Sequence, residues 1–558
     1  MENKIHKNKL KALIVVHDNH QDSNTFPLGA GYIAAVLREQ NVEVETYCMD
    51  VFHYTNEDLI EHLNDNNYDL VMAGFMVPRW RRTVRTLCTT IRENIDHNAW
   101  FILGGYGPSA IPEYIIEQTG ADIIIVGEGE LQMVDVVHSK RTGGKDTLDQ
   151  ISGIVYRNNG VIHTNPRRPK NNNLDSLPFP AWDLFPMDRY TTNYKFTGMG
   201  DDDRAGSLIS TRGCTDKCSF CFRLEQGIRS RSPESVVEEM ILLNKNYGIN
   251  YYKFSDELAI ISKGKILKLT NLIKQKLPGI HYRMDVRVSI FSDDIAFALR
   301  ESGCVFLNIG FESSSQEVLD QMNKRVAVNQ NVRAAEIAIK YGIGLGINMI
   351  WGMPSDNEKT LRDNAMFIKK YNQYDQIRTI RPVTPYPGSP LYYKAIAEGY
   401  LKGPQDFFDK FKNADRYMVN FMGMPEDKIY ELLIEVNTDL ILDHFNHTSG
   451  NMKMAYHMID ELTKLYSNEA YTYTGPRHYA AANSKGEADN LALRSSYLKP
   501  LATGSDAGGE VFSTDACGDE VMTPIFNVIN EDIDTEIQED LLSRGAKDSR
   551  FKRALGSE

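Results

Sequence analysis

The sequence predicts an α/β protein with two parallel-sheet units in tandem: a five-stranded doubly wound sheet, then a partial barrel of six strand–helix units. Two observations predict this fold class. Short aliphatic runs alternate with amphipathic helical patterns, and these runs are nearly continuous, as in strands that are buried on both faces. In addition, 558 residues are too many for one ordinary hydrophobic core.

The first unit, residues 1–140, contains five predicted strands separated by helical patterns. An open parallel sheet of this kind binds ligands beyond the carboxyl ends of its strands. The predicted strands are Ala12 to Val16, Val42 to Tyr47, Asp69 to Phe75, Trp100 to Gly104 and Asp122 to Gly127.

A linker over residues 141–205 is expected to follow. Its Pro-rich run from Leu174 to Pro186 is unsuited to a helix and predicts an ordered, extended connection.

The second unit, residues 206–403, alternates six strands with helices. Chemistry in such barrels takes place at the carboxyl ends of the strands, so residues that follow each strand are the functional candidates. We expect a helical cap over residues 404–470 and a loosely ordered tail over residues 471–558, which is rich in Gly, Ser, Ala and Asp. The predicted strands are Leu208 to Thr211, Tyr251 to Phe254, His281 to Val286, Val305 to Gly310, Gly344 to Ile350 and Arg378 to Pro382.

Composition narrows the function classes. A net charge of −13 argues against a generic nucleic-acid binder. No apolar run approaches the roughly 20 residues that cross a membrane, and the apolar part of the Lys-rich start is too short for a signal peptide. We therefore expect a cytoplasmic protein.

Three of the seven cysteines, Cys214, Cys218 and Cys221, crowd into one loop after the first barrel strand. Three thiolates can hold a 4Fe-4S cluster and leave one iron open to a ligand, and Gly213 allows the loop to turn sharply. A structural zinc site is the alternative, but it normally has four protein ligands, and no fourth Cys or His lies nearby.

The Cys-x3-Cys-x2-Cys spacing, with Phe220 just before the third cysteine, resembles the signature of the radical S-adenosylmethionine (SAM) superfamily. The resemblance implies that the open iron binds the methionine part of SAM. It also implies SAM contacts at the ends of later strands, although the two glycines of the family's Gly-Gly-Glu segment are missing here, and Glu312 has a barrel-mouth salt bridge as its alternative reading. The implied SAM contacts are Phe220, Ser255, Asp256, Glu257, Arg287, Glu312 and Asn348.

The amino-terminal unit resembles the Rossmann-like cobalamin-binding domains of certain radical SAM families. Gly74-Phe-Met76, followed after 27 residues by Gly104-Gly105, is similar to their Ser-x-Leu…Gly-Gly element, with Gly for Ser and Met for Leu. His20 is a candidate lower ligand to cobalt, although a solvated loop histidine is the more common case, and the domain could also bind nothing. The implied cobalamin contacts are Leu28, Gly29, Gly74, Met76, Gly104, Gly105, Tyr106 and Glu128.

Together these resemblances imply a partial TIM barrel that generates a 5′-deoxyadenosyl radical and transfers a methyl group from methylcobalamin to an unactivated carbon. An oxidative cyclase or ring-rearranging enzyme of the same superfamily is an alternative, and a cobalamin carrier or sensor without catalysis is another. A transfer-RNA methylthiotransferase is disfavoured, because that family has three further amino-terminal cysteines and this region holds only Cys48 and Cys88. The expected partners are a small-molecule or peptide substrate and an electron donor such as flavodoxin or ferredoxin.

Overall fold

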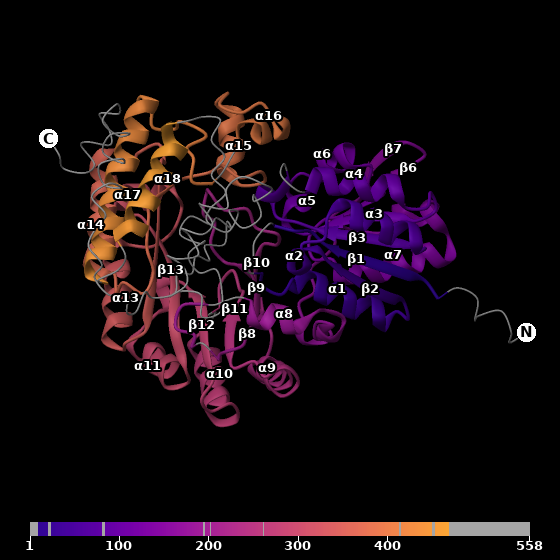
Figure 1. The fold of residues 1–558 in the computed structure, drawn as a ribbon, viewed down its shortest axis with the longest axis horizontal. Helices are drawn as coiled ribbons and strands as arrows, with labels where there is room; N and C mark the ends of the chain where they lie inside the picture. Colours follow the sequence, from indigo (N-terminus) through magenta and orange to yellow (C-terminus); the bar gives the residue numbers. More distant parts are fainter. Residues whose placement is uncertain are drawn as a thin grey trace, which may run out of the picture.

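A computed structural model describes residues 9–19, 24–80, 84–193, 196–200, 202–259, 262–411, 414–448 and 452–467. Two α/β units lie side by side, with the last helices on the side of the second unit that is remote from the first (Figure 1). The expected tail, residues 471–558, and His20 lie outside the described residues.

The amino-terminal sheet has the strand order β2-β1-β3-β4-β5-β6-β7, and its first five strands are parallel, which confirms the predicted doubly wound sheet. Helices α1 and α7 cover one face, while α3, α4 and α6 cover the other (Figure 1). The five parallel strands are β1 (Lys11–Val16), β2 (Glu43–Cys48), β3 (Leu70–Gly74), β4 (Trp100–Gly104) and β5 (Ile123–Ile125). The helices are α1 (Leu28–Glu39), α2 (Met49–Phe52), α3 (Asn56–Asp65), α4 (Arg85–Asn94), α5 (Tyr106–Ala110), α6 (Pro112–Thr119) and α7 (Glu130–Thr142).

Two antiparallel strands, β6 (Ile154–Asn158) and β7 (Val161–Thr164), extend this sheet in the segment that was expected to be linker. Their turn consists of Asn159 and Gly160, both with positive φ (49° and 79°), which is the conformation of a tight type I′ hairpin.

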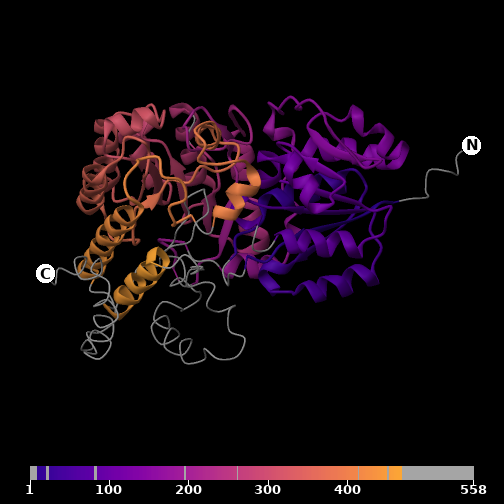
Figure 2. The same ribbon diagram turned by 90° about the horizontal axis from the view of Figure 1, so that it is seen from above.

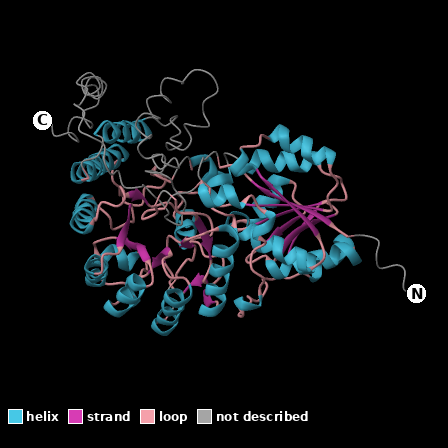
Figure 3. Ribbon diagram, turned by 60° about the horizontal axis from the view of Figure 1, so that its bottom comes forward, coloured by secondary structure: helices cyan, strands magenta, loops and turns pink. Residues whose placement is uncertain are grey.

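The second sheet is a curled half-barrel with the order β8-β11-β12-β13-β14-β15, all parallel, as predicted (Figure 3). The predicted first strand is displaced: β8 ends at Leu208, and residues after it form a separate ribbon of β9 (Thr211–Cys214) and β10 (Gly227–Ser230). The barrel strands are β8 (Ala205–Leu208), β11 (Tyr251–Phe254), β12 (His281–Val286), β13 (Cys304–Glu312), β14 (Gly344–Trp351) and β15 (Arg381–Pro382). The surrounding helices are α9 (Pro233–Tyr247), α10 (Lys263–Lys276), α11 (Asp293–Glu301), α12 (Gln316–Gln321), α13 (Val328–Lys340) and α14 (Glu358–Tyr371).

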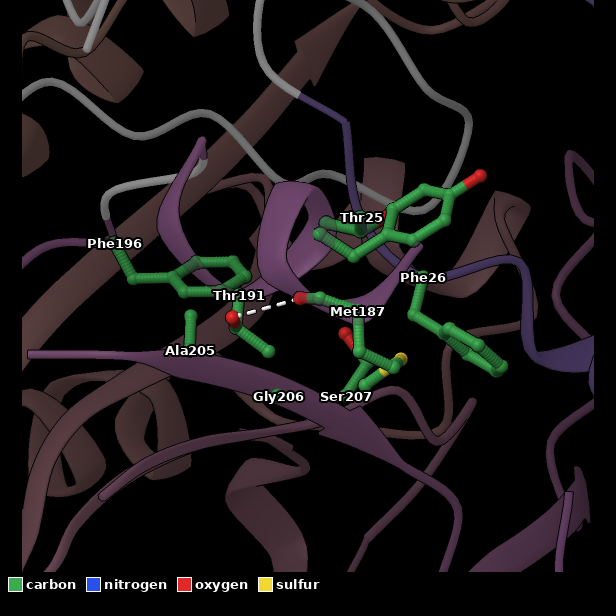
Figure 4. A pocket seen from close by; sticks show the side chains of 9 residues that line it. Thr25, Phe26, Met187, Thr191, Phe196, Ala205, Gly206 and Ser207 are labelled. Atoms are coloured by element: carbon green, nitrogen blue, oxygen red, sulfur yellow. Dashed lines mark hydrogen bonds between the residues drawn. The ribbon is translucent and has the colours of Figure 1, made fainter. Parts of the chain in front are cut away.

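The connecting region is ordered and packs on both units. The Trp182 ring packs, tilted by 37°, on Phe26 of the first unit, with 4.0 Å between the ring centroids, and helix α8 (Met187–Thr192) lies against β8. A small pocket remains between them, where Thr191 Oγ1 donates to the Met187 carbonyl (2.8 Å) and Phe196 and Ala205 line the wall (Figure 4). Its size and apolar lining are those of a packing gap.

Helices α15 (Pro390–Ala397), α16 (Pro404–Lys410), α17 (Glu426–His447) and α18 (Met452–Ser467) form the expected helical carboxyl-terminal region. Helix α17 packs along α14, and its Asn437 amide bonds both the N–H (2.7 Å) and the carbonyl (3.0 Å) of Ile380 next to β15. The pair α17–α18 thus covers the β15 edge of the half-barrel and projects away from the amino-terminal unit (Figure 2). Among the described helices, none has the length and apolarity to cross a membrane.

Candidate active site

The cysteine loop is held in a tight position at the carboxyl end of the barrel. Gly213 has φ +82°, and a Cβ there would lie 2.2 Å from the Gly227 carbonyl oxygen, so the β9–β10 ribbon requires glycine at this position. Further along, the N–H of Ser219 donates to the Met322 carbonyl (2.8 Å), and the Ser219 carbonyl accepts from Leu391 (2.7 Å). The loop is therefore tied to the ends of two later strand–helix units.

The three cysteines fit a cluster better than a single metal ion. Cys218 is buried, Cys214 is half-buried and Cys221 is exposed. Among the described residues, these sulfur atoms do not all gather within 4.8 Å of one another, whereas thiolates around one zinc ion lie about 3.8 Å apart. Burial raises the pKa of Cys218 to about 11, while Lys324 favours the thiolate, and a bound metal centre would favour it further.

A buried ion pair lies beside the cysteines. Lys324 Nζ lies 2.8 Å from Glu312 Oε1, and the Lys324 ammonium also acts electrostatically on Cys214, Cys218 and Cys221. Burial opposes the charge of Lys324, but the Glu312 carboxylate and nearby thiols hold the pKa of this lysine above its ordinary value. An ammonium group at this point can bind the carboxylate of an amino acid that is chelated to a cluster.

Lys324 is a site residue that no local sequence pattern indicates. This residue follows Glu312 by twelve positions and lies in a loop after α12, not directly after a strand. Glu312 itself has φ +62°, and a Cβ on Gly310 would lie 2.3 Å from its Oε1 atom, so the glycine leaves room for the carboxylate. In the structure, Glu312 therefore forms a salt bridge with Lys324 at the barrel mouth, which was the alternative interpretation of this carboxylate.

Two other predicted SAM contacts are engaged with the cysteine segment. Asp256 is buried and accepts from the N–H groups of Ser210 (2.7 Å) and Thr211 (2.8 Å), where β9 begins. Arg287 Nη1 lies 2.6 Å from Asp216 Oδ1, between the first two cysteines. Both side chains therefore fix the path of the loop, and a direct contact from either to SAM stays a prediction.

The remaining predicted SAM contacts lie around the barrel mouth. Phe220 is half-buried against the apolar cluster that includes Val318 and Leu391. Ser255 is half-buried after β11, and Asn348, on β14, donates from Nδ2 to Asn308 Oδ1 (3.1 Å).

The carboxyl edge of the amino-terminal sheet has the open backbone that a large cofactor needs. Gly74 and Gly105 are exposed at the adjoining ends of β3 and β4, and a Cβ on Gly74 would lie 3.4 Å from the Gly104 carbonyl. At the start of α1, exposed Gly29 has no neighbour within 4 Å of its Cβ position, and Leu28 and Met76 flank this edge half-buried. This glycine shelf, made of Gly29, Gly74, Gly104 and Gly105, leaves the backbone accessible to cobalamin.

The glycine shelf lies against the cysteine loop. The Tyr106 hydroxyl donates a short hydrogen bond to Glu257, which follows β11, and the Tyr106 ring meets Phe222 edge-on at 6.2 Å between centroids. Tyr106, the residue that follows Gly105, thus contacts both Glu257 of the proposed SAM segment and Phe222, the residue after Cys221.

Charged side chains reinforce the same junction. Glu128 accepts from Arg229 Nη1 (2.9 Å), and Arg212 Nη2 lies 2.6 Å from Glu130 Oε1, with its guanidinium 4.9 Å above the Tyr32 ring. These ion pairs join the loop after β5 to the β9–β10 ribbon. The carboxylate of Glu128, predicted as a cobalamin contact, is therefore occupied by arginine in the structure.

The half-barrel carries three cysteines at its mouth, and these cysteines face the glycine shelf of a doubly wound sheet. This arrangement defines a class of enzyme that pairs an iron–sulfur cluster with a second, bulky cofactor. Residues 208–368 match the model of the radical SAM superfamily, and residues 19–137 match the B12 binding domain.

Individual proteins that resemble this chain support the same two-domain assignment. An uncharacterized methyltransferase of Pyrococcus horikoshii is 30% identical over 380 residues, which cover 67% of this chain and 79% of that protein. The anaerobic magnesium-protoporphyrin IX monomethyl ester cyclase of Rubrivivax gelatinosus is 25% identical over 68% of this chain and 69% of its own. The solved structure of the radical SAM methyltransferase TsrM from Kitasatospora setae, with cobalamin and a [4Fe-4S] cluster bound, superposes with a TM-score of 0.57 at 18% identity, over 70% of this chain and 75% of that one. The chain belongs to the radical SAM superfamily, in the group that also carries a cobalamin-binding domain.

Proposed function

We propose that this enzyme transfers a methyl group to an unactivated carbon of its substrate, with SAM as the source of both the radical and the methyl group. The contact between Tyr106 and Glu257 carries the proposal, because it brings the cobalamin shelf to the segment that we assign to SAM. The methyltransferase relative, which is similar over two thirds of this chain, supports it.

When bound, the cluster supplies the electron that cleaves SAM, and cobalamin supplies the methyl group. The chain's own residues bind and orient. Cys214, Cys218 and Cys221 would ligate three irons, Lys324 would pair with the SAM carboxylate, and Glu312 would hold the Lys324 ammonium in place. Asp256 fixes the start of β9, so that the first cysteine keeps its position during turnover.

The reacting atoms must also be aligned and shielded from water, and we assign this role to the interface between the units. The Tyr106 contact and the ion pair between Glu128 and Arg229 hold the two cofactor regions face to face.

An oxidative cyclisation is the second candidate, because the cyclase relative covers the same share of the chain as the methyltransferase. Both reactions begin with hydrogen abstraction, and they differ in the bond that is formed afterwards. For either reaction we propose a cytoplasmic enzyme with a small-molecule or peptide substrate and a flavodoxin or ferredoxin as electron donor.

The test is anaerobic reconstitution with iron, sulfide and hydroxocobalamin, then reduction in the presence of methyl-deuterated SAM and candidate substrates. Methyl transfer yields labelled product together with 5′-deoxyadenosine and S-adenosylhomocysteine. Cyclisation yields deoxyadenosine without S-adenosylhomocysteine.

The negative control is the variant in which Cys214, Cys218 and Cys221 are all replaced by alanine. This variant should form no deoxyadenosine. Zinc in place of iron in the purified anaerobic protein, or turnover that survives this triple replacement, would contradict the proposed function.

A further inference from the structure

The interior of the half-barrel is lined by charged side chains from neighbouring strands. Lys253, Arg283 and Phe306 are paired across β11, β12 and β13, and one level nearer the mouth Asp285, Asn308 and Gly346 are paired across β12, β13 and β14. Side chains of adjacent paired residues share a face of a sheet. The opposite face carries Tyr252 and Tyr282, whose hydroxyls bond the surrounding helices, so the charged face points into the barrel.

Arg378 enters this interior from the segment before β15. Its guanidinium lies above Gly346, where a Cβ would come within 2.4 Å of both Arg378 Nη2 and Asn308 Oδ1. Any larger residue at position 346 would displace the guanidinium. Because Gly346 has no side chain, there is room above it for the guanidinium of Arg378.

The partners of Arg378 are neutral. Nη1 donates to Asn348 Oδ1 (3.0 Å) and Nη2 donates to Gln376 Oε1, while Nε has no hydrogen-bond partner among the described residues. The side chain is only 5% exposed. Burial, together with repulsion from Arg283 and Arg381, lowers the pKa of Arg378 to about 9, and the attraction of Asp285 opposes this shift only in part.

Of the other carboxylates nearby, Asp415 lies 3.0 Å from Arg381. Asp375 lies beside Gly344, one pair deeper in the barrel than Gly346, and within the described part of the chain it forms no ion pair with Arg378. A buried guanidinium without its own counter-ion costs stability, so a chain that keeps one needs it for another purpose. The orientation indicates that purpose, because Arg378 donates a hydrogen bond to Asn348, a residue that we predict as a SAM contact.

We propose that Arg378 binds an anionic group of the substrate, a carboxylate or a phosphoryl-type oxyanion, and that the enzyme therefore acts on an acid. This inference rests on the proposed function for the location of the reaction, because it assigns the barrel interior to the substrate. A guanidinium binds either oxyanion through paired N–H donors, and the bound anion would give Arg378 the counter-ion that its hydrogen-bond partners do not supply.

The test uses holoenzyme with reconstituted cluster, cobalamin and saturating SAM, and monitors the unfolding midpoint as probes are added. The probes are benzoate, phenylphosphonate and neutral benzamide, which share a ring and differ in charge. We expect at least one of the two anions, and not benzamide, to raise the Tm in a saturable manner. The anion that does so identifies the oxyanion class.

Arg378→Gln should weaken this anion binding by about tenfold or more, the value of a charge-assisted hydrogen bond. Arg378→Lys keeps the charge and should retain part of the binding. Arg362→Gln, the same change at an arginine paired with Glu358 and Glu435 on the outer helices, should bind the anions as wild type does.

A stability measurement separates an anion anchor from a structural arginine. Because Arg378 lacks a counter-ion of its own, unliganded Arg378→Gln should unfold at a Tm no lower than that of wild type. A markedly lower Tm, anion binding that persists in this variant, or the absence of an anion-specific shift in wild type would each overturn the inference.

The remaining outcomes distinguish this inference from the proposed function. Anion shifts that occur only without SAM would assign Arg378 to the SAM carboxylate and also overturn the inference. If wild type cleaves SAM yet binds no anion, the inference alone fails. If it binds anions through Arg378 yet cannot cleave SAM, the proposed function fails instead.

Discussion

The hydroxyl group of Tyr106 donates a hydrogen bond to the carboxylate of Glu257, which lies 151 residues further along the chain. Tyr106 begins the helix after the glycine shelf, and Glu257 follows the second barrel strand. This pair therefore fixes the distance between the two cofactor regions, and its loss should affect the step that needs both of them.

Tyr106→Phe keeps the ring against Phe222 and removes the hydroxyl. We expect methyl transfer to fall by up to about tenfold, because a hydrogen bond to a charged group contributes at most about 1.5 kcal/mol at a site that solvent reaches. The measurement is the ratio of S-adenosylhomocysteine to deoxyadenosine, which should drop. Tyr393→Phe, at a tyrosine that is 57% exposed on α15, is the control and should leave the ratio unchanged.

Glycine at position 213 is the second feature that can be tested. Gly213→Ala places a Cβ against the Gly227 carbonyl and forces a left-handed conformation on alanine. We expect the purified, reconstituted variant to hold less than half of the wild-type iron, since the first cysteine is the next residue.

Gly264→Ala is the matched control. Gly264 lies in the first turn of α10, and its Cβ position has no neighbour within 4 Å, so alanine should fit without strain and leave the iron content intact. Full iron loading in Gly213→Ala would show that the ribbon can relax around a side chain.

The strands and the cysteine loop were predictable because local patterns specify them. Buried parallel strands are short aliphatic runs, and β4, β11 and β12 have the predicted bounds. The β6–β7 hairpin carried a local signal too, an Asn159-Gly160 turn, but the exposed residues of β7 lack the apolar alternation that marks a strand.

Long-range ion pairs explain what the sequence could not predict. Glu128 meets Arg229, a residue 101 positions away, and Lys324 acquires its role only because the fold brings a loop beside the cysteines. Similarly, no local pattern shows that Arg378 needs the space above Gly346. Such contacts depend on how two sheets face one another, which periodicity and turn chemistry do not encode.

The ion pair between Arg229 and Glu128 should stabilise the junction between the units. The two side chains are only 6% and 14% exposed, so Arg229→Met leaves a poorly solvated carboxylate that Arg212, 3.6 Å away, compensates only in part. We expect a loss of about 2–4 kcal/mol in urea unfolding of the protein.

Lys340→Met is the comparison for that loss, because Lys340 pairs with Asp293 on the surface at 62% and 43% exposure. Exposed pairs contribute little, so the loss should be much smaller than that of Arg229→Met. Equal effects of the two substitutions would mean that the buried pair adds no specific stability to the junction.

The buried carboxylate of Asp50, on α2, should make the free energy of unfolding depend on pH. This carboxylate accepts from the Tyr190 hydroxyl of α8 (2.8 Å), and burial raises the pKa of Asp50 from 3.8 to about 7. Between these two values the folded chain binds more protons than the unfolded chain, so this group makes folding less favourable as the pH rises toward 7. Asp50→Asn removes the ionisation and retains an oxygen for Tyr190.

We therefore expect Asp50→Asn to gain stability relative to wild type as the pH rises from 5 to 8, by an amount on the order of 2–4 kcal/mol. Chemical unfolding at several pH values measures this difference. Asp149→Asn, at an exposed aspartate, should differ from wild type by the same small amount at every pH. If the Asp50→Asn difference also stays constant with pH, or shrinks as the pH rises, the buried carboxylate is ionised throughout this range and its contact with Tyr190 stabilises the charge.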